Sequence, residues 1–206
     1  MKFKDTYYKD LTGTVYDGEI DLRQLDVTSL EGAPLEIRGN FLCSETGITS
    51  LKYAPATIRG NLYAGRSNLK TLQDMPTDIT GSIYLNGNNI TSLKGAPYIA
   101  NGLFDCSDNK LTSLEGAPKL VQGSFICSFN KITTFKGAEN MRVTGDFDCR
   151  KNPIENIKEE IVKYNIVANR YLTKDGTILF IEIEQEMKKY NSISSKGFRT
   201  LLGLTK

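Results

Sequence analysis

Apolar and polar residues alternate along short stretches of this chain, and the alternating stretch returns about every 21 residues. One clear copy, VQGSFICSFNKITTFKGA, covers residues 121–138 and alternates from Val121 to Cys127. A period of two is typical of a β-strand that turns one face toward a core. We therefore expect one strand in each copy, with Phe125 and Cys127 facing inward and Ile126 facing outward.

A single glycine marks each copy of the pattern. Five successive intervals between these glycines are 21 residues and the sixth is 22; the glycines are Gly18, Gly39, Gly60, Gly81, Gly102, Gly123 and Gly145. One unit of this length cannot bury its own apolar face, but a stacked neighbour can cover it. The repeat predicts a solenoid in which seven strands form one parallel sheet and the glycines stack in one column.

The second half of each copy predicts a bend and further core contacts. An asparagine stands at the bend in the later copies, as Asn88, Asn109, Asn130 and Asn152. Buried asparagines at such positions bond backbone groups that the turn leaves unpaired, so we expect a ladder of them. Leu25, Thr46 and Ser67 take this position in the first three copies, and the ladder should be weak there.

The ends of the chain differ from the repeat. We expect an N-terminal cap over residues 1–17, a solenoid of seven turns over 18–157 and a C-terminal cap or extension over 158–206. The stretch IENIKEEIVKYNI has helical spacing, and Lys174-Asp175-Gly176 favours a hairpin turn between two β-rich runs. The last segment either completes the cap or docks a partner; its apolar residues are Phe198, Leu201, Leu202 and Leu204.

The residue pattern of the repeat resembles the leucine-rich repeat, because FICSFNKITTF stands where that family has LxLxxNxLxxL. The resemblance covers about 140 of the 206 residues. Copies such as LTSLEGAP are similar to those of small short-period repeat proteins of bacteriophages and bacteria. The family implies an α/β repeat fold, a leucine-rich-repeat solenoid with a curved parallel β-sheet and here a small C-terminal α+β cap. Asp74-Met75-Pro76 departs from the usual Gly-Ala-Pro.

Composition limits the classes of function. The chain is 39% apolar with a net charge of +2, which suits a folded domain and disfavours a large nucleic-acid interface. Its start lacks an apolar signal region and no 18-residue apolar run occurs, so we expect neither secretion nor a membrane span, and a cytoplasmic protein.

Residues for chemistry are scarce in this sequence. There are four cysteines and no histidine, and the cysteines fall four residues after a repeat glycine, at Cys43, Cys106, Cys127 and Cys149. Leucine or alanine fills this slot in other copies, which indicates buried reduced thiols, with disulfides between rungs as the alternative. Asp105, Asp146 and Asp148 are outward acidic rungs. We expect no catalytic residue, no metal site and no cofactor.

Outward strand positions carry the functional hypothesis, because stacking does not dictate them. Leu42, Tyr63 and Tyr84 are consecutive in one outward column, with Leu103 one column over and Ile126 at the margin. A face that meets only water should be polar there, so these residues favour an interface, although cross-rung pairing for stability would also explain the tyrosines. Arg38 and Arg59 occupy another outward column and suit an acidic partner.

These observations predict a non-enzymatic protein–protein interaction module. The family resemblance implies a phage-encoded protein in the host bacterial cytoplasm that acts on, or is sensed by, a host protein. A nucleic-acid binder that stacks bases on its tyrosines is one alternative. A self-associating structural subunit is another, since the sequence leaves the oligomeric state open.

Overall fold

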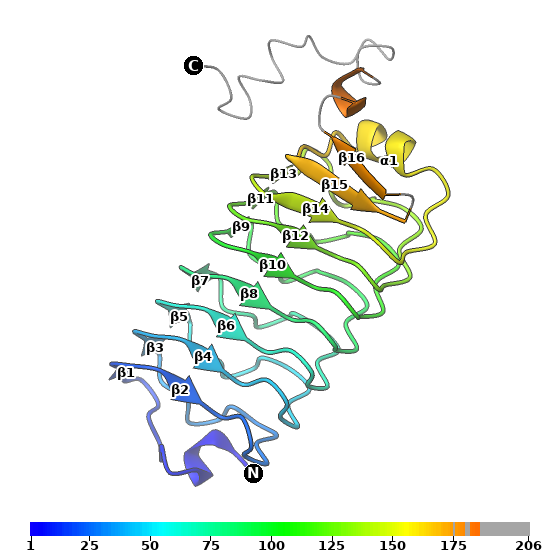
Figure 1. Cartoon of the computed structure of the whole chain (residues 1–206). Coiled ribbons are helices and arrows are strands. Elements are labelled where there is room, and N and C mark those ends of the chain that lie inside the picture. The colour runs from blue at the N-terminus through cyan, green and yellow to red at the C-terminus, as the bar shows by residue number, and fades with distance from the viewer. Residues whose placement is uncertain (175, 180–181, 186–206) are drawn as a thin grey trace, which may run out of the picture.

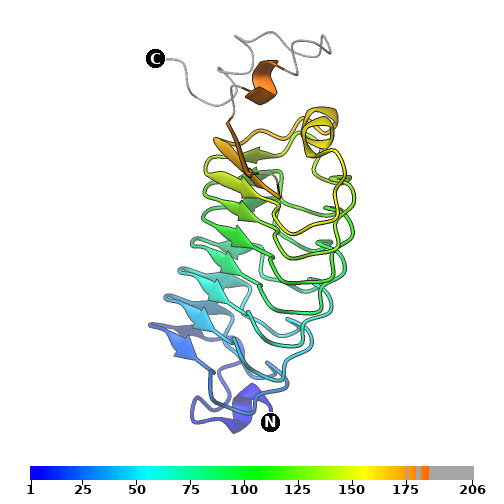
Figure 2. The ribbon, with the colours of Figure 1, turned by 45° about the vertical axis from the view of Figure 1, so that its right-hand side comes forward.

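The computed structural model describes residues 1–174, 176–179 and 182–185, and it shows a parallel β-solenoid of about eight turns (Figure 1). One nine-stranded main sheet runs along its length, and Figure 2 shows these strands stacked along one edge. Every neighbouring pair is parallel except the last, β15 with β16. In chain order the strands are β2 (Ile20–Asp21), β4 (Phe41–Leu42), β6 (Leu62–Tyr63), β8 (Ile83–Tyr84), β10 (Phe104–Asp105), β12 (Phe125–Ile126), β14 (Asp146–Asp148), β15 (Arg170–Thr173) and β16 (Gly176–Leu179).

The seven turns marked by the repeat glycine supply the seven parallel strands β2 to β14, as predicted. Phe104 pairs in register with Ile83 on one side and Phe125 on the other, so the inward residues form one column. The glycines also stack as predicted. A Cβ at Gly39 would lie 2.3 Å from the carbonyl oxygen of Gly18, so successive backbones approach too closely at this column for any side chain.

The alternating stretch is not one continuous strand, which corrects the sequence prediction. It breaks at the glycine corner, with Val121 in β11 (Leu120–Val121) and Phe125 in β12. The alternation of buried and outward residues continues across the break, because β11 buries Val121 and β12 buries Phe125. Only the tight corner at Gly123 separates the two strands.

The strands before the corners form a second set, which we call the side ladder. It consists of β1 (Val15–Tyr16), β3 (Glu36–Ile37), β5 (Thr57–Ile58) and β7 (Asp78–Ile79) in one sheet, and β9 (Ile99–Ala100), β11 and β13 (Arg142–Val143) in another. Between β7 and β9 the side-chain Nδ2 of Asn101 donates to the carbonyl oxygen of Ile79 at 2.8 Å. A backbone N–H takes this role in neighbouring turns, for example from Gln122 to the oxygen of Ala100.

The core fills the space between the two sets of strands. Phe104, Phe125 and Phe147 are fully buried on successive rungs, and their rings stack at centroid distances of 5.7 and 5.5 Å. All four cysteines are buried and free, which confirms the buried reduced thiols. Burial raises the pKa of the Cys43 and Cys149 thiols to about 12.

The asparagine ladder is present and links consecutive turns. The Oδ1 of Asn109 accepts from the N–H of Ile90 in the preceding turn at 3.0 Å. Its Nδ2 donates to carbonyl oxygens of its own turn and of the preceding one. In the earlier turns the hydroxyls of Thr46 and Ser67 take this place: both donate to the Cys43 carbonyl, at 2.7 and 3.2 Å, and the Ser67 hydroxyl accepts from the Thr46 N–H at 3.3 Å. Each hydroxyl has one proton to donate where the asparagine amide has two, and Leu25 in the first copy has none. The ladder is therefore weaker at the N-terminal end, as predicted.

An eighth rung follows the seventh glycine-marked turn, so the solenoid extends beyond residue 157. The helix α1 (Ile157–Lys163) lies within the stretch expected to be helical, and β15 then joins the main sheet beside β14. Tyr171 pairs with Phe147 in register and is fully buried. Asn169 stands where the repeat glycine would be, which hid this turn from a search based on glycine.

The N-terminal residues cover the first turn. The short helix η1 (Phe3–Asp5) buries Phe3 completely, and the Phe3 N–H donates to the Ser29 carbonyl at 2.8 Å. Two tyrosines reach the outer edge of β2: the Tyr8 hydroxyl accepts from the Asp21 N–H at 2.8 Å, and the Tyr7 hydroxyl donates to the Asp21 carbonyl at 3.3 Å. These contacts occupy both backbone groups of Asp21 that face away from the sheet.

No helix among the described residues is long and apolar enough to cross a membrane. The apolar C-terminal residues singled out in the sequence lie outside the described residues; they are Phe198, Leu201, Leu202 and Leu204.

Candidate functional site

The outward side of the main sheet, which we call the strand face, carries the residues expected at a binding site. In each main-sheet strand from β2 to β12 the first of the two residues is buried in the core, as is the middle residue of β14, so the residue that follows it points outward. Backbone register places these outward positions in one column: Asp21, Leu42, Tyr63, Tyr84, Asp105, Ile126 and Asp148. The structure therefore brings Leu42, Tyr63 and Tyr84 together as predicted.

The two tyrosines form a flat aromatic surface. Their rings are stacked with centroids 4.8 Å apart and planes 4° from parallel, close to the spacing of neighbouring strands. The Asn61 Nδ2 donates to the Tyr63 hydroxyl at 3.1 Å. Both rings are half-buried. The pair stabilises the sheet by cross-rung stacking and also leaves aromatic surface open on the strand face.

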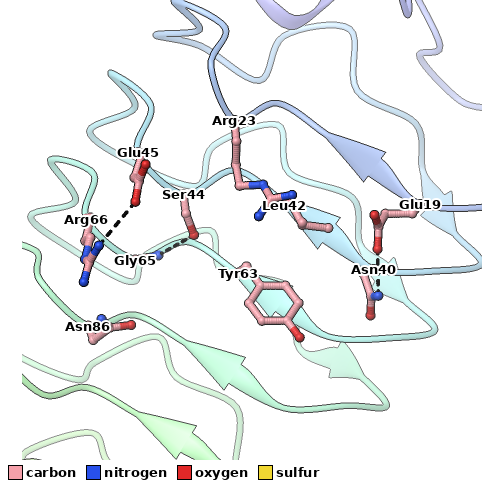
Figure 3. Close-up of a pocket in the computed structure, with 10 residues that line it drawn as sticks. All are labelled: Glu19, Arg23, Asn40, Leu42, Ser44, Glu45, Tyr63, Gly65, Arg66 and Asn86. Atoms are coloured by element: carbon pink, nitrogen blue, oxygen red, sulfur yellow. Dashed lines mark hydrogen bonds and ion pairs between the residues drawn. The ribbon is translucent and has the colours of Figure 1, made fainter.

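A hollow of about 440 Å³ lies beside this column (Figure 3). Gly65, which has no side chain, lines it between Ser44 and Asn86, which occupy the same outward position on the neighbouring turns. Leu42 is only 7% exposed. The hollow is lined by Glu19, Arg23, Asn40, Leu42, Ser44, Glu45, Tyr63, Gly65, Arg66 and Asn86.

Ion pairs and hydrogen bonds hold the rim of the hollow. Arg23 binds both carboxylate oxygens of Asp21, at 3.0 Å through Nε and 2.8 Å through Nη2. These bonds lower the pKa of the Asp21 carboxyl. Arg66 reaches Glu45 at 3.5 Å, with both side chains largely exposed. Figure 3 shows this pair on the turn side of the hollow, opposite the Tyr63 ring. The hollow thus has positively and negatively charged side chains at its rim, and Leu42 and Tyr63 supply its apolar surface.

A second outward column, two residues before the first, is mainly a structural ladder. The Asn40 Oδ1 accepts from the N–H of Asn61 at 2.9 Å, and the Asn61 Oδ1 accepts from the N–H of Ser82 at 2.7 Å. Ser82 and Ser124 do the same for the next rungs through their hydroxyls. Leu103 interrupts this column, since its half-buried aliphatic side chain has no acceptor.

Ile126 lies on the strand face between Asp105 and Asp148. The later carboxylates are engaged separately: Asp148 by Arg150 at 2.7 Å and Asp146 by Arg170 at 2.7 Å. Asp148 is 5% exposed although its position is outward. Among the described residues, no group of three or more His, Cys, Asp or Glu side chains is arranged to hold a metal ion.

Arg38 and Arg59 do not join the tyrosines. They follow β3 and β5 of the side ladder, because the glycine corner separates that ladder from the main sheet. Both arginines already have carboxylate partners: Arg38 contacts Asp17 and Glu36 at 3.3 Å, and Arg59 contacts Glu36 at 3.7 Å and Asp78 at 3.1 Å. The prediction that both arginines lie in an outward column of the main sheet is therefore wrong, because they lie at the side ladder.

Three residues that line the hollow on its turn side were not predicted from the sequence. Arg23, Ser44 and Gly65 lie two residues after Asp21, Leu42 and Tyr63, and so share their outward side. The same period of two that identified the first column could have found them.

A scan against protein-family models, a search of curated proteins and a search of solved structures each found no match.

Proposed function

We propose that this chain is a non-enzymatic protein-binding solenoid of the leucine-rich-repeat kind, which binds a macromolecular partner through its strand face. The observation that carries the proposal is the unbroken run Leu42, Tyr63, Tyr84 beside a hollow of about 440 Å³. Rigid aromatic side chains framed by polar groups are the usual centres of protein interfaces.

The nucleic-acid alternative is weakened by two features of the structure. The rings of Tyr63 and Tyr84 stack on each other, which leaves no space between them for a base. The arginines near the strand starts, Arg38 and Arg59, are neutralised by carboxylates, and the chain has a net charge of only +2. Phosphate binding requires cations that are available to release counterions.

The origin and setting of the protein belong to the same proposal. On the resemblance of the repeat alone, we propose a phage-encoded protein that acts in the bacterial cytoplasm on a host protein, or is sensed by one.

The test compares two sets of tyrosine variants. Proteins captured from bacterial lysate by the full chain should be lost with the Tyr63→Ala/Tyr84→Ala variant. They should be retained with Tyr98→Ala, which removes a 73% exposed tyrosine next to the side ladder. With a purified partner, each strand-face substitution should cost about 2 kcal/mol of binding free energy or more. Equal capture by all three proteins would contradict the proposal, and a large fall in melting temperature would make the tyrosines structural.

A further inference from the structure

We propose that Asp105 is the anchor for a basic side chain, lysine or arginine, of the protein that binds the strand face. This inference rests on the proposed function and adds to it the chemistry of the partner. Two independent features lead to it. The Asp105 carboxylate has no cationic partner among the described residues, and one of the apolar side chains around it, Leu103, interrupts the structural ladder.

Asp105 differs from the other acidic residues of the strand face in its partners. Asp21 is bound by Arg23, Asp146 by Arg170 and Asp148 by Arg150, each through both carboxylate oxygens. Glu19 accepts from the Asn40 amide at 2.8 Å. In the part of the chain that the structure describes, the Asp105 carboxylate accepts only from Ser107, from its N–H at 2.9 Å and its hydroxyl at 2.6 Å.

The sequence shows the origin of this difference. Asp21 and Asp148 are each followed two residues later by an arginine on the same side of the strand, Arg23 and Arg150. Ser107 takes that position after Asp105 and brings no charge. Within the described part of the chain, the negative charge of Asp105 therefore has no cationic partner, whereas Asp21, Asp146 and Asp148 on the same face each have an arginine.

The surroundings of Asp105 are apolar on three sides. Tyr84 and Ile126 are its register partners on the two neighbouring strands, and Leu103 lies two residues before it on the same face. All three side chains are half-buried. The Tyr84 hydroxyl makes no hydrogen bond within the described residues, so it also offers a polar contact.

Leu103 gives the second observation. Its position in the outward ladder is held by Ser82 one rung before and by Ser124 one rung after, and both hydroxyls accept from the next backbone N–H. Leucine cannot supply this bond, so the ladder loses a contact where the apolar surround is completed. Contact between the Leu103 side chain and a partner would explain why leucine, and not serine or asparagine, stands at this position.

This combination fits a long cationic side chain. The methylene stem of a lysine or arginine can lie along Leu103 and Ile126 while its charged head meets the Asp105 carboxylate, and the Tyr84 ring adds a cation–π contact. Docking would remove water from this region and strengthen the ion pair. An acidic side chain in the same place would be repelled.

The experiment selects ligands from a random linear peptide library displayed on yeast, with the purified full chain as bait. Peptides that bind the parent but not the Tyr63→Ala/Tyr84→Ala variant are bound at the strand face, and we expect them to be enriched in lysine or arginine. Asp105→Asn keeps the acceptor for Ser107 and removes the charge, and it should weaken these peptides by about tenfold or more. Asp105→Lys should select acidic peptides in their place.

Asp108→Asn is the matched control, because Asp108 is exposed on the turn of the same rung and makes no ion pair within the described residues. It should leave peptide affinity within about twofold of the parent. Strand-face peptides without basic enrichment, or equal affinities for Asp105→Asn and the parent, would overturn the inference and leave the proposed function standing. A library that yields no peptide sensitive to the tyrosine variant would count against both.

Discussion

Removal of one rung of the asparagine ladder should destabilise the whole solenoid. Asn109 is 8% exposed and makes one bond as acceptor, from the N–H of Ile90, and three as donor. In the Asn109→Ala variant the Ile90 N–H loses its acceptor inside the core. An orphaned buried donor costs about 1–3 kcal/mol.

The three carbonyls that Asn109 serves are less affected, because each keeps another donor. The oxygen of Leu85 keeps the amide of Asn88 at 2.9 Å, and that of Cys106 keeps the amide of Asn130 at 3.0 Å. The oxygen of Ser107 keeps the Gly87 N–H at 3.1 Å. With a small contribution from the space left by the amide, the total loss should be about 2–4 kcal/mol.

The assay is equilibrium unfolding in urea, followed by far-ultraviolet circular dichroism and by tyrosine fluorescence, since the chain has 10 tyrosines and no tryptophan. Coincident transitions would support two-state treatment. Ser67→Ala is the comparison at the weak end of the ladder. It removes two long bonds, from the Thr46 N–H at 3.3 Å and to the Cys43 carbonyl at 3.2 Å, and that carbonyl keeps the Thr46 hydroxyl at 2.7 Å, so the loss should be about 1–2 kcal/mol. A loss for Asn109→Ala no larger than that for Ser67→Ala would refute the reasoning.

Two further predictions concern the backbone and the thiols. Gly123→Ala should lower the melting temperature far more than Gly13→Ala. A Cβ at Gly123 would lie 2.7 Å from the Gly102 carbonyl carbon, whereas a Cβ at Gly13 meets nothing within 4 Å and suffers only the strain of a φ of +76°. Equal melting temperatures would contradict the close stacking of the repeat glycines. Burial raises the pKa of the Cys43 thiol from its ordinary 9.0 to about 12, so the unfolded chain releases this proton first and stability should fall as the pH rises through that interval. Relative to Cys43→Ala, the parent should lose on the order of 1–2 kcal/mol of unfolding free energy between about pH 8 and about pH 10.5, and a constant difference between the two would contradict the burial of this thiol.

The period of the sequence predicted the main sheet because two constraints agree at each position. Phe125 must face inward to bury its ring, and the glycine at 123 must stack on glycine at 102, so a shift of one residue would violate both. The break at the corner was not predictable from alternation. Val121 before it and Phe125 after it are both buried and lie an even number of positions apart, as they would in one continuous strand.

The same corner explains the error at the arginines. Arg38 lies directly before the repeat glycine Gly39, and a continuous strand would have carried it onto the strand face with Leu42. The turn at the glycine instead directs it to the side ladder beside Glu36. The period of two could have located residues that line the hollow, but not its shape, because the shape depends on how the side chains of several neighbouring turns meet.

The tyrosine contacts at β2 bear on how a chain of this kind can change in length. The hydroxyls of Tyr7 and Tyr8 bond to the first strand of the main sheet and, among the described residues, to no later strand, so this closure is independent of the number of copies that follow. Duplication or deletion of a 21-residue block among the internal copies would leave this closure intact. The strand face could then lengthen or shorten in steps of one strand spacing, about 4.8 Å, while the same tyrosine hydroxyls still cover the unpaired backbone groups of the first strand.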